Sequence, residues 1–404
     1  MCGNSEMGWD EFIRGIAECE NRLNRSGQRG GDKLFLPNSW RALALDRTRK
    51  HFHNHRKFSF LELLEMFYYT RSSKPRDKLF ALLNMGYDTG IGREAFNPDY
   101  DSTEQIILAR YAKQFVEDGL VLDLLYRAGT DKGSDFCSWI PDLMNQQRKT
   151  QYPPTISTWE AAGPGSQRGF RAAQFLPQAR LRGDITIGDH VTPVLGIVGI
   201  VLDSIQSCHP LEIGSRDTGI QFSNTLRDLR RYISHLDFYP NAGKNWKEEL
   251  LIKCLIGDAI RPQNNAHGPL SSQSQQTRPL EWPEGFEQEV LAVKPNQNAH
   301  EYAAKSPGSL AVIDQFWQTA ANFTSRIPNA TVCITEKGYM GIVPGSAVPG
   351  DKIFVAHGAK VPFVLKKNTD MAFYRLVGEC YMHGLMYHDD HKAGKFKQEE
   401  VRIV

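Results

Sequence analysis

The sequence has little that would mark a secreted or membrane-bound protein. Its seven cysteines are dispersed, odd in number and without a C-x-x-C pair. This usage is typical of reduced thiols inside the cell and not of a disulfide framework or a zinc site. No apolar run approaches the roughly 18 to 20 residues needed to cross a bilayer, and the polar N-terminus has no basic or apolar signal region. We therefore expect a cytoplasmic protein that does not enter a membrane.

An excess of one charge is also missing. The 48 lysines and arginines nearly balance the 46 aspartates and glutamates, which leaves a formal net charge of +2. This balance gives no electrostatic reason to expect nucleic acid as a partner. The sequence also lacks a G-x-S-x-G elbow, a G-x-G-x-x-G after a strand, a Walker loop and H-E-x-x-H. Enzymes that depend on NAD, ATP or zinc are disfavoured, and we expect no cofactor.

Two histidine-bearing stretches are the candidates for a metal site. His51, His53 and His55 would lie on one face of an extended segment, but lysines and arginines surround them, so that a cation would meet like charge. The stretch 388–391 combines two histidines and two aspartates near the C-terminus, where a tail rarely holds rigid geometry. We expect no metal at either place.

What is present indicates a globular α+β protein. Apolar residues make up 41% and charged residues 23% of 404 positions, so the chain is long enough for two or three subdomains. Periodicity and composition predict a helical region over 1–135, a loop-rich segment with strands over 136–205, a helical region over 206–325 and a β-unit over 326–404. A polar stretch at 261–279 reads as an insertion within the third segment.

Local signals support the helical assignments. Ser59 with Glu62 forms a capping-box pattern. Ser102 with Gln105 precedes the clearest apolar stripe, and Gly119 is placed to end that helix. Later in the chain, the stretches 179–187 and 193–205 are predicted strands.

Short strands separated by glycine turns dominate the last 75 residues. Because such strands pair with their neighbours, we expect a helical N-terminal region packed with an antiparallel β-unit of about five strands, which is a small barrel or a curled sheet. The five strands are predicted over 332–335, 339–343, 352–356, 361–366 and 373–381.

The last predicted strand carries the most suggestive polar side chains. Alternation along an extended chain places Arg375, Val377, Glu379, Tyr381 and His383 on one face. That face either lines a cleft or meets solvent, and the sequence leaves both alternatives open.

Seven short blocks resemble blocks of the fungal heterokaryon-incompatibility (HET) family in order and spacing. Examples are P-R-D-K-L-F-A-L-L from residue 75, P-D-Y from 98 and S-W-I-P-D from 138. The middle of the chain, 206–325, lies outside this resemblance. The family's N-terminal TIR-like core is also absent, so its effector activity is not carried over to this chain. The remaining blocks cover 334–341, 349–351, 361–365 and 376–384.

The resemblance leaves two hypotheses of different classes. The first is a scaffold recruited as a cofactor-independent cyclase, which closes a [4+2] ring of Diels–Alder type in an apolar fungal natural product such as a terpenoid. The alternative is a non-catalytic protein-interaction scaffold in fungal self/non-self recognition. For the cyclase, Tyr381, His383, Tyr339 and Arg375 are the predicted hydrogen-bond donors. Glu379 would orient one of them, and Trp139 would form an apolar wall. The oligomeric state is left open.

Overall fold

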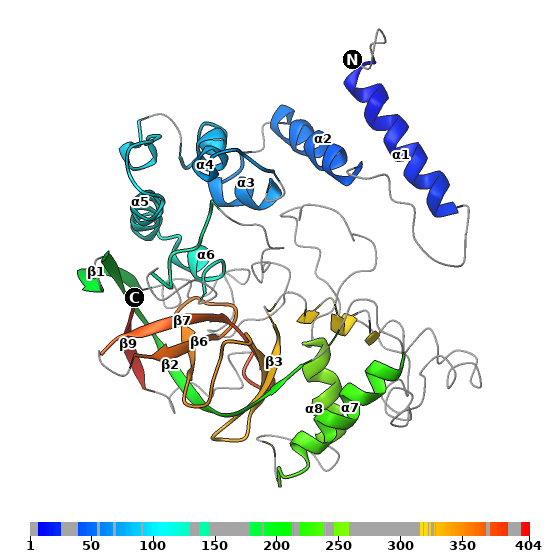
Figure 1. Ribbon diagram of the computed structural model, residues 1–404, viewed down its shortest axis with the longest axis vertical. Helices are drawn as coiled ribbons and strands as arrows, with labels where there is room; N and C mark the ends of the chain where they lie inside the picture. The colour runs from blue at the N-terminus through cyan, green and yellow to red at the C-terminus, as the bar shows by residue number, and fades with distance from the viewer. Residues whose placement is uncertain are drawn as a thin grey trace, which may run out of the picture. The chain divides into compact units, whose positions relative to one another are not determined.

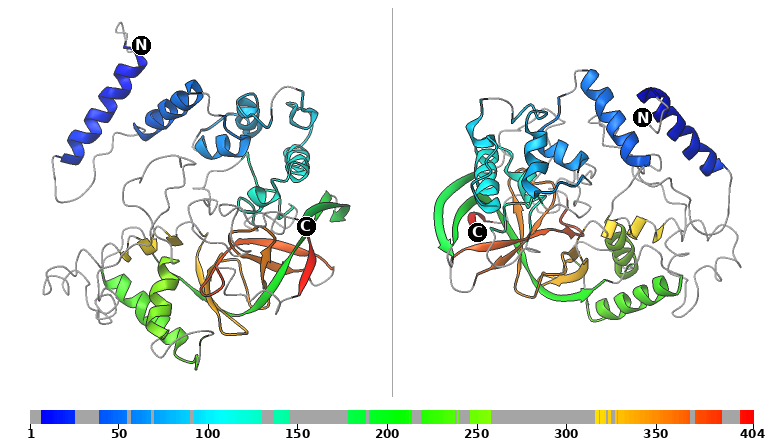
Figure 2. Two further views of the ribbon diagram at one scale, coloured as in Figure 1. Left: turned by 180° about the vertical axis from the view of Figure 1, so that it is seen from behind. Right: turned by 45° about the horizontal axis from the view of Figure 1, so that its top comes forward.

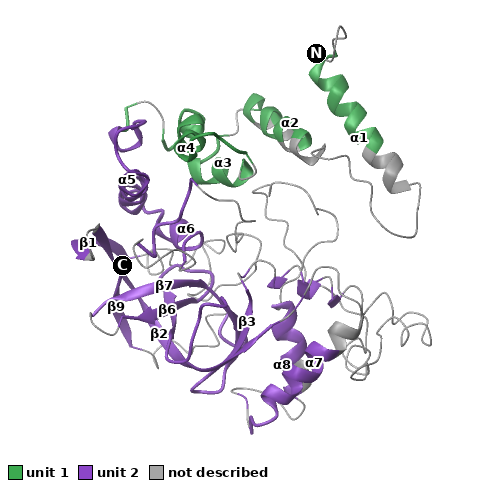
Figure 3. Ribbon diagram, in the orientation of Figure 1, with its two compact units in different colours: residues 1–93, 262–275 green, residues 94–261, 276–404 purple. Residues whose placement is uncertain are grey.

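The chain forms two compact units (Figure 3). The first contains Met1–Arg93 and Pro262–Gln275, and the second contains Glu94–Arg261 and Gln276–Val404. The computed structural model describes residues 7–25, 39–54, 57–67, 70–89, 92–129, 137–144, 178–187, 190–211, 213, 219–237, 239, 246–257, 316–317, 319–321, 323–324, 327, 329–368, 372–386 and 397–404. The predicted insertion at 261–279 and the histidine stretch at 388–391 lie outside these residues.

The first unit is helical in its described part. Its helices are α1 (Trp9–Arg25), α2 (Ser39–His53), α3 (Phe60–Met66) and α4 (Pro75–Leu83). The predicted capping box is confirmed at α3, because the Ser59 side chain accepts a hydrogen bond from the Glu62 amide and the Glu62 carboxylate accepts one from the Ser59 amide. His51 and His53 of the histidine run are helical and not extended, since α2 continues through His53, and His55 lies outside the described residues.

The helices of the second unit include the predicted stripe. Its described helical elements are the short 3₁₀ helix η1 (Glu94–Phe96), α5 (Glu104–Glu117), α6 (Val121–Leu125), α7 (Gly219–Ile233) and α8 (Trp246–Ile256). The stripe of α5 is buried, and Gly119 adopts φ +81° just beyond its end. The predicted start was wrong by one position: Thr103 caps α5, with its side chain accepting from the Ile106 amide.

In the described residues of the second unit, nine strands form one sheet. They run in the order β5-β6-β7-β9-β2-β3-β4-β8, with β1 on β2 and a further pairing of β2 with β5. The strands are β1 (Ala179–Ile187), β2 (His190–Pro210), β3 (Thr331–Thr335), β4 (Met340–Val343), β5 (Lys352–Ala356), β6 (Phe363–Lys367), β7 (Tyr374–Glu379), β8 (Tyr381–Met382) and β9 (Gln398–Ile403).

Strand β2 joins two parts of this sheet, and its long green ribbon can be followed past both in Figures 1 and 2. Its first half pairs with β9 and its middle with β5, so that β2, β5, β6, β7 and β9 close into a ring. Its last residues pair with β3, which continues to β4 and β8 and is called the second sheet below. All pairings are antiparallel except that of β7 with β9.

The α+β fold and the C-terminal antiparallel strands are confirmed, including positive φ at the turn glycines Gly338, Gly350 and Gly358. Two details differ from the prediction. The five predicted strands do not close the ring by themselves, because β2, from before residue 326, and β9, a sixth strand near the C-terminal end, complete it. Strict alternation along 374–383 also fails, since the register between β6 and β7 shifts next to Val377. Val377 therefore joins Cys380 and Met382 in one buried core cluster.

Candidate functional site

Three of the six predicted site residues meet in the second sheet, around a tyrosine from a different segment. Tyr339 lies in the turn between β3 and β4, Tyr381 lies in β8, and His383 follows β8. Tyr239 lies between α7 and α8. These four residues are called the tyrosine–histidine cluster.

Hydrogen bonds hold the cluster together. The Tyr239 hydroxyl donates to the backbone oxygen of His383 at 2.8 Å and accepts from the amide of Met340 at 3.3 Å. The Tyr381 hydroxyl and Nδ1 of His383 lie 3.1 Å apart. The imidazole tautomer decides which of these two groups donates. Both phenol groups are thus engaged within the protein.

Aromatic contacts surround these bonds. The Tyr239 ring lies 5.7 Å from the His383 ring and 6.2 Å from the Tyr339 ring between centroids. It also stacks on Trp246 at 5.6 Å. Burial raises the pKa of Tyr239 well above its ordinary value, although the hydrogen bond from Met340 acts in the opposite direction. Tyr239 therefore stays a neutral phenol at any physiological pH.

Exposure divides the cluster into two halves. The side chains of Tyr239 and Tyr381 are 7% and 1% exposed, whereas Tyr339 and His383 are half-buried. Only the second pair can meet a molecule from solvent without a rearrangement. The chemistry open to the cluster is therefore hydrogen bonding by the Tyr339 phenol and by His383, which the buried Tyr381 hydroxyl orients.

The structure places Arg375 and Glu379 on β7 instead. Arg375 pairs with Lys366 and Glu379 with Phe363, both in β6. The Glu379 carboxylate acts electrostatically on Tyr126, whose ring stacks on Phe363 and whose pKa is raised mainly by burial. These two residues are thus tied to the ring.

Trp139 also belongs to the ring. Its indole is fully buried and donates to the backbone oxygen of Pro193 in β2 at 3.0 Å. The neighbouring Ser138 hydroxyl donates to the Val404 carbonyl oxygen and accepts from the amide of Leu376 at 2.8 Å. This part of the S-W-I-P-D block joins three distant segments of the chain through backbone groups.

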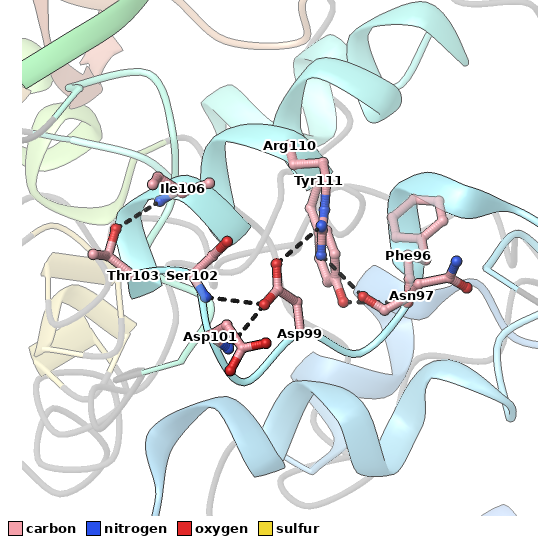
Figure 4. A network of polar contacts seen from close by, with 9 residues as sticks. All are labelled: Phe96, Asn97, Asp99, Asp101, Ser102, Thr103, Ile106, Arg110 and Tyr111. Carbon is pink, nitrogen blue, oxygen red and sulfur yellow. Dashed lines mark hydrogen bonds and ion pairs between the residues drawn. The ribbon is translucent and has the colours of Figure 1, made fainter.

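The P-D-Y block has a comparable structural role, which Figure 4 shows. One carboxylate oxygen of Asp99 accepts from the amides of Asp101 and Ser102, at 3.0 and 2.9 Å. The other lies 3.3 Å from the guanidinium of Arg110 in α5. These bonds, with Ser102 first, lower the pKa of Asp99 to about 2. The block therefore shapes the entry into α5.

Tyr239 is the member of the cluster that sequence reasoning missed. It is a single tyrosine outside every recognised block and follows the helix α7. Only its place in space, against the β3–β4 turn and the end of β8, reveals its role. No local motif could have indicated it.

The part of the chain that the structure describes holds neither a metal-ligating group nor a membrane-spanning helix. Among its residues, no group of three or more histidine, cysteine, aspartate or glutamate side chains could hold a metal ion. Within the same residues, every helix is too short or too polar to cross a membrane.

Comparison with known proteins gives the class of the C-terminal region. Residues 272–402 match the Het-6 beta-barrel domain, a range that contains β3 to β8 and all but the last residue of β9. Heterokaryon incompatibility protein 6, OR allele, of Neurospora crassa is 38% identical over 77 residues. That alignment covers 18% of this chain and 10% of the relative. No solved structure matches the chain. Over these residues, the chain is similar to the Het-6 beta-barrel domain and to a heterokaryon incompatibility protein.

Proposed function

We propose that this protein is a heterokaryon-incompatibility-type interaction scaffold, which works in fungal self/non-self recognition without catalysing a reaction. The match of residues 272–402 to the Het-6 beta-barrel domain carries this proposal. The name of the Neurospora crassa relative supports it. The cluster agrees with it as well, because its buried hydroxyls are engaged with protein groups and not turned to solvent.

A forced-heterokaryon assay tests this proposal. The gene is placed in one of two otherwise identical fungal strains, and the growth of the fused mycelium is compared with that of a fusion without the gene, over a panel of partner backgrounds. We expect a growth penalty in at least one pairing. The penalty should persist with Tyr381→Phe, because a scaffold needs the fold and not the phenol. Equal growth with and without the gene in every pairing would overturn the proposal.

One observation favours a second candidate, the cofactor-independent cyclase. His383 and Tyr339 are half-buried polar groups beside a buried aromatic wall. Holding a flexible apolar substrate folded can supply up to about 7 to 11 kcal/mol of an intramolecular barrier. A hydrogen bond to a substrate carbonyl adds roughly 3 kcal/mol. In this arrangement His383 would meet the substrate and Tyr381 would orient it.

Product analysis of apolar polyenes incubated with the protein tests this candidate. His383→Ala and Tyr381→Phe should slow ring closure by about 10- to 1000-fold, while the melting temperature changes by only a few degrees. Arg375→Lys serves as the control on β7. Full activity in both cluster variants, or no conversion by the wild type, would exclude the cyclase.

A further inference from the structure

Three cysteines gather in the core beside the second sheet. Cys333 of β3 and Cys380 are members of the buried core cluster, and Cys208 of β2 packs against it. All three are free thiols. The proposed function uses none of them.

The strand register sets Cys208 directly opposite Cys333. Further along the same ladder, the amide of Leu211 donates to the carbonyl of Ala330 at 3.2 Å. Hydrogen-bonded and non-hydrogen-bonded pairs alternate between antiparallel strands. Leu211 and Ala330 are thus a hydrogen-bonded pair, and Cys208 and Cys333 lie three pairs before it on the same ladder. The alternation therefore makes Cys208 and Cys333 a non-hydrogen-bonded pair. Pro210, which has no N–H group, occupies the other non-hydrogen-bonded position nearby, as this alternation requires.

This position suits a disulfide. The Cα atoms of a non-hydrogen-bonded pair lie about 4.5 Å apart, which falls within the roughly 4.4 to 6.8 Å found across disulfides. Directly opposed side chains also share one face of the sheet. Side-chain rotation can therefore join the two sulfur atoms while both strands stay in register.

The surroundings give the two thiols different exposure. Cys208 is partly exposed, with its sulfur 3.7 Å from the carbonyl oxygen of Ala347, whereas Cys333 is fully buried. Burial, followed by the nearby carboxylate of Asp351, raises the pKa of Cys208. Burial likewise raises the pKa of Cys333. Both thiols are thus protonated at neutral pH, and Cys208 is the one that an oxidant reaches first.

We propose that Cys208 and Cys333 form an oxidation site, which closes into a cross-strand disulfide when the protein meets hydrogen peroxide. The Cys208 thiol first loses its proton, and its thiolate attacks one peroxide oxygen and breaks the O–O bond. The released hydroxide takes up that proton as the first water molecule, and Cys208 is left as a sulfenic acid. The Cys333 sulfur then attacks the sulfenic sulfur, and the hydroxyl group leaves with a proton as a second water molecule. One peroxide is reduced by two electrons, and two thiols become one disulfide.

The bond would join β2 to β3, and with them the ring to the second sheet. Because the two positions are far apart in the chain, the bond would strongly restrict the unfolded state. Oxidation would therefore stabilise the fold and fix the tyrosine–histidine cluster against the ring. This inference goes beyond the proposed function and does not depend on it.

Peptide mapping of the full chain tests the oxidation site. The protein carries Cys19→Ala, which removes an exposed thiol, and Cys2→Ala, at a position outside the described residues. It is treated with hydrogen peroxide, alkylated and digested without reductant. We expect one linked peptide pair containing Cys208 and Cys333 that dithiothreitol releases, and a rise in melting temperature of roughly 10 °C. Cys208→Ala should abolish both changes, whereas Cys137→Ala, a buried cysteine held by Pro193, should keep both.

The peptide map of the protein that keeps Cys208 and Cys333 decides the matter even if Cys208→Ala fails to fold. A Cys208 that is oxidised to sulfinic acid without a link would overturn the proposal. So would a link from Cys208 to Cys380, or a Cys208–Cys333 link that forms only when urea is present.

Discussion

The ring and the second sheet share β2 but are held by different kinds of contact. At the ring, Ser138 and Trp139 bond to backbone groups of Leu376, Val404 and Pro193. At the second sheet, Tyr239 likewise bonds to backbone groups, those of His383 and Met340, but Tyr381 and His383 bond to each other through their side chains. Backbone partners exist whatever the neighbouring side chains are, whereas a side-chain pair needs both residues. The contacts that close the ring therefore tolerate changes in the partner side chains. The Tyr381–His383 contact of the second sheet requires both of its side chains.

The largest expected effect would break the second sheet. Gly341 in β4 has no room for a side chain, because a Cβ atom there would overlap the carbonyl oxygen of Tyr381 and the sulfur of Met382. Gly341→Ala should lower the free energy of unfolding by about 3 kcal/mol or more, measured by urea titration. The control is Gly15→Ala in α1, where a Cβ atom meets nothing within 4 Å and helix propensity favours alanine.

Hydrogen exchange on the same variant sharpens the comparison. If the ring closes by its own contacts, the amides of Ser138 and Leu376 should keep their protection in Gly341→Ala while those of β3 and β4 lose it. Equal loss in both places would mean that the two parts unfold as one.

A second prediction weakens the ring. Ser138→Ala removes the acceptor of the buried Leu376 amide and the donor to Val404. Because a buried N–H group is left without its partner, the free energy of unfolding should fall by about 2 kcal/mol. Ser234→Ala is the matched control, since that hydroxyl bonds the Arg231 carbonyl at the surface and its loss should be near neutral. A Ser138 variant as stable as the control would contradict the assignment of ring closure to this residue.

A third prediction concerns the cluster. Tyr239→Phe keeps the ring contacts but removes the bonds to the His383 oxygen and from the Met340 amide. The free energy of unfolding should fall by about 1 kcal/mol. Thermal and chemical unfolding experiments measure this loss. Tyr100→Phe, at a side chain 56% exposed, should change it little. If both variants behave alike, the Tyr239 hydroxyl does not hold the cluster.

More of the fold than of the candidate site can be predicted from the sequence. Strand positions from 331 to 379 follow from glycine turns and local alternation, which are properties of neighbouring residues. The closure of the ring depends on β2 and β9, whose pairing with each other spans half the chain. No local pattern encodes such a pairing.

The candidate site also depends on contacts between distant parts of the chain, which local patterns do not encode. Tyr339, Tyr381 and His383 lie in recognisable blocks. Tyr381 and His383 meet directly, whereas Tyr339 is joined to His383 through Tyr239, which no pattern marks. Strict alternation groups Arg375 and Glu379 with Tyr381 and His383. The bulge at Val377 breaks this pattern after Arg375, and the chain changes its partner strand from β6 to β4 between Glu379 and Tyr381. The division of the chain at 135, 205 and 325 stays a prediction, as does every catalytic role.

The smallest expected effect is electrostatic and lies on the outer side of the ring. Glu400 of β9 pairs with both Arg182 and Arg180 of β1, on either side of β2. Gly196 of β2 lies between them, and a Cβ atom there would overlap the Glu400 carboxylate. The bridge thus exists because β2 has no side chain at that point.

Acid should remove the contribution of this bridge. The hydrogen bond from Arg182, followed by that from Arg180, lowers the pKa of Glu400 to about 2, from an ordinary value of 4.5. A carboxyl group whose pKa is lower in the folded state stabilises the fold above pH 4.5, and this contribution is lost as the pH falls from about 4.5 to about 2. Because the pair is near the surface, Glu400→Gln should lower the melting temperature by only about 1 to 3 °C at pH 7. The gap to the wild type should close near pH 2, and salt should narrow it at pH 7. Glu399→Gln on the same strand is the control, and an equal shift in that variant would show that net charge, and not the bridge, sets the effect.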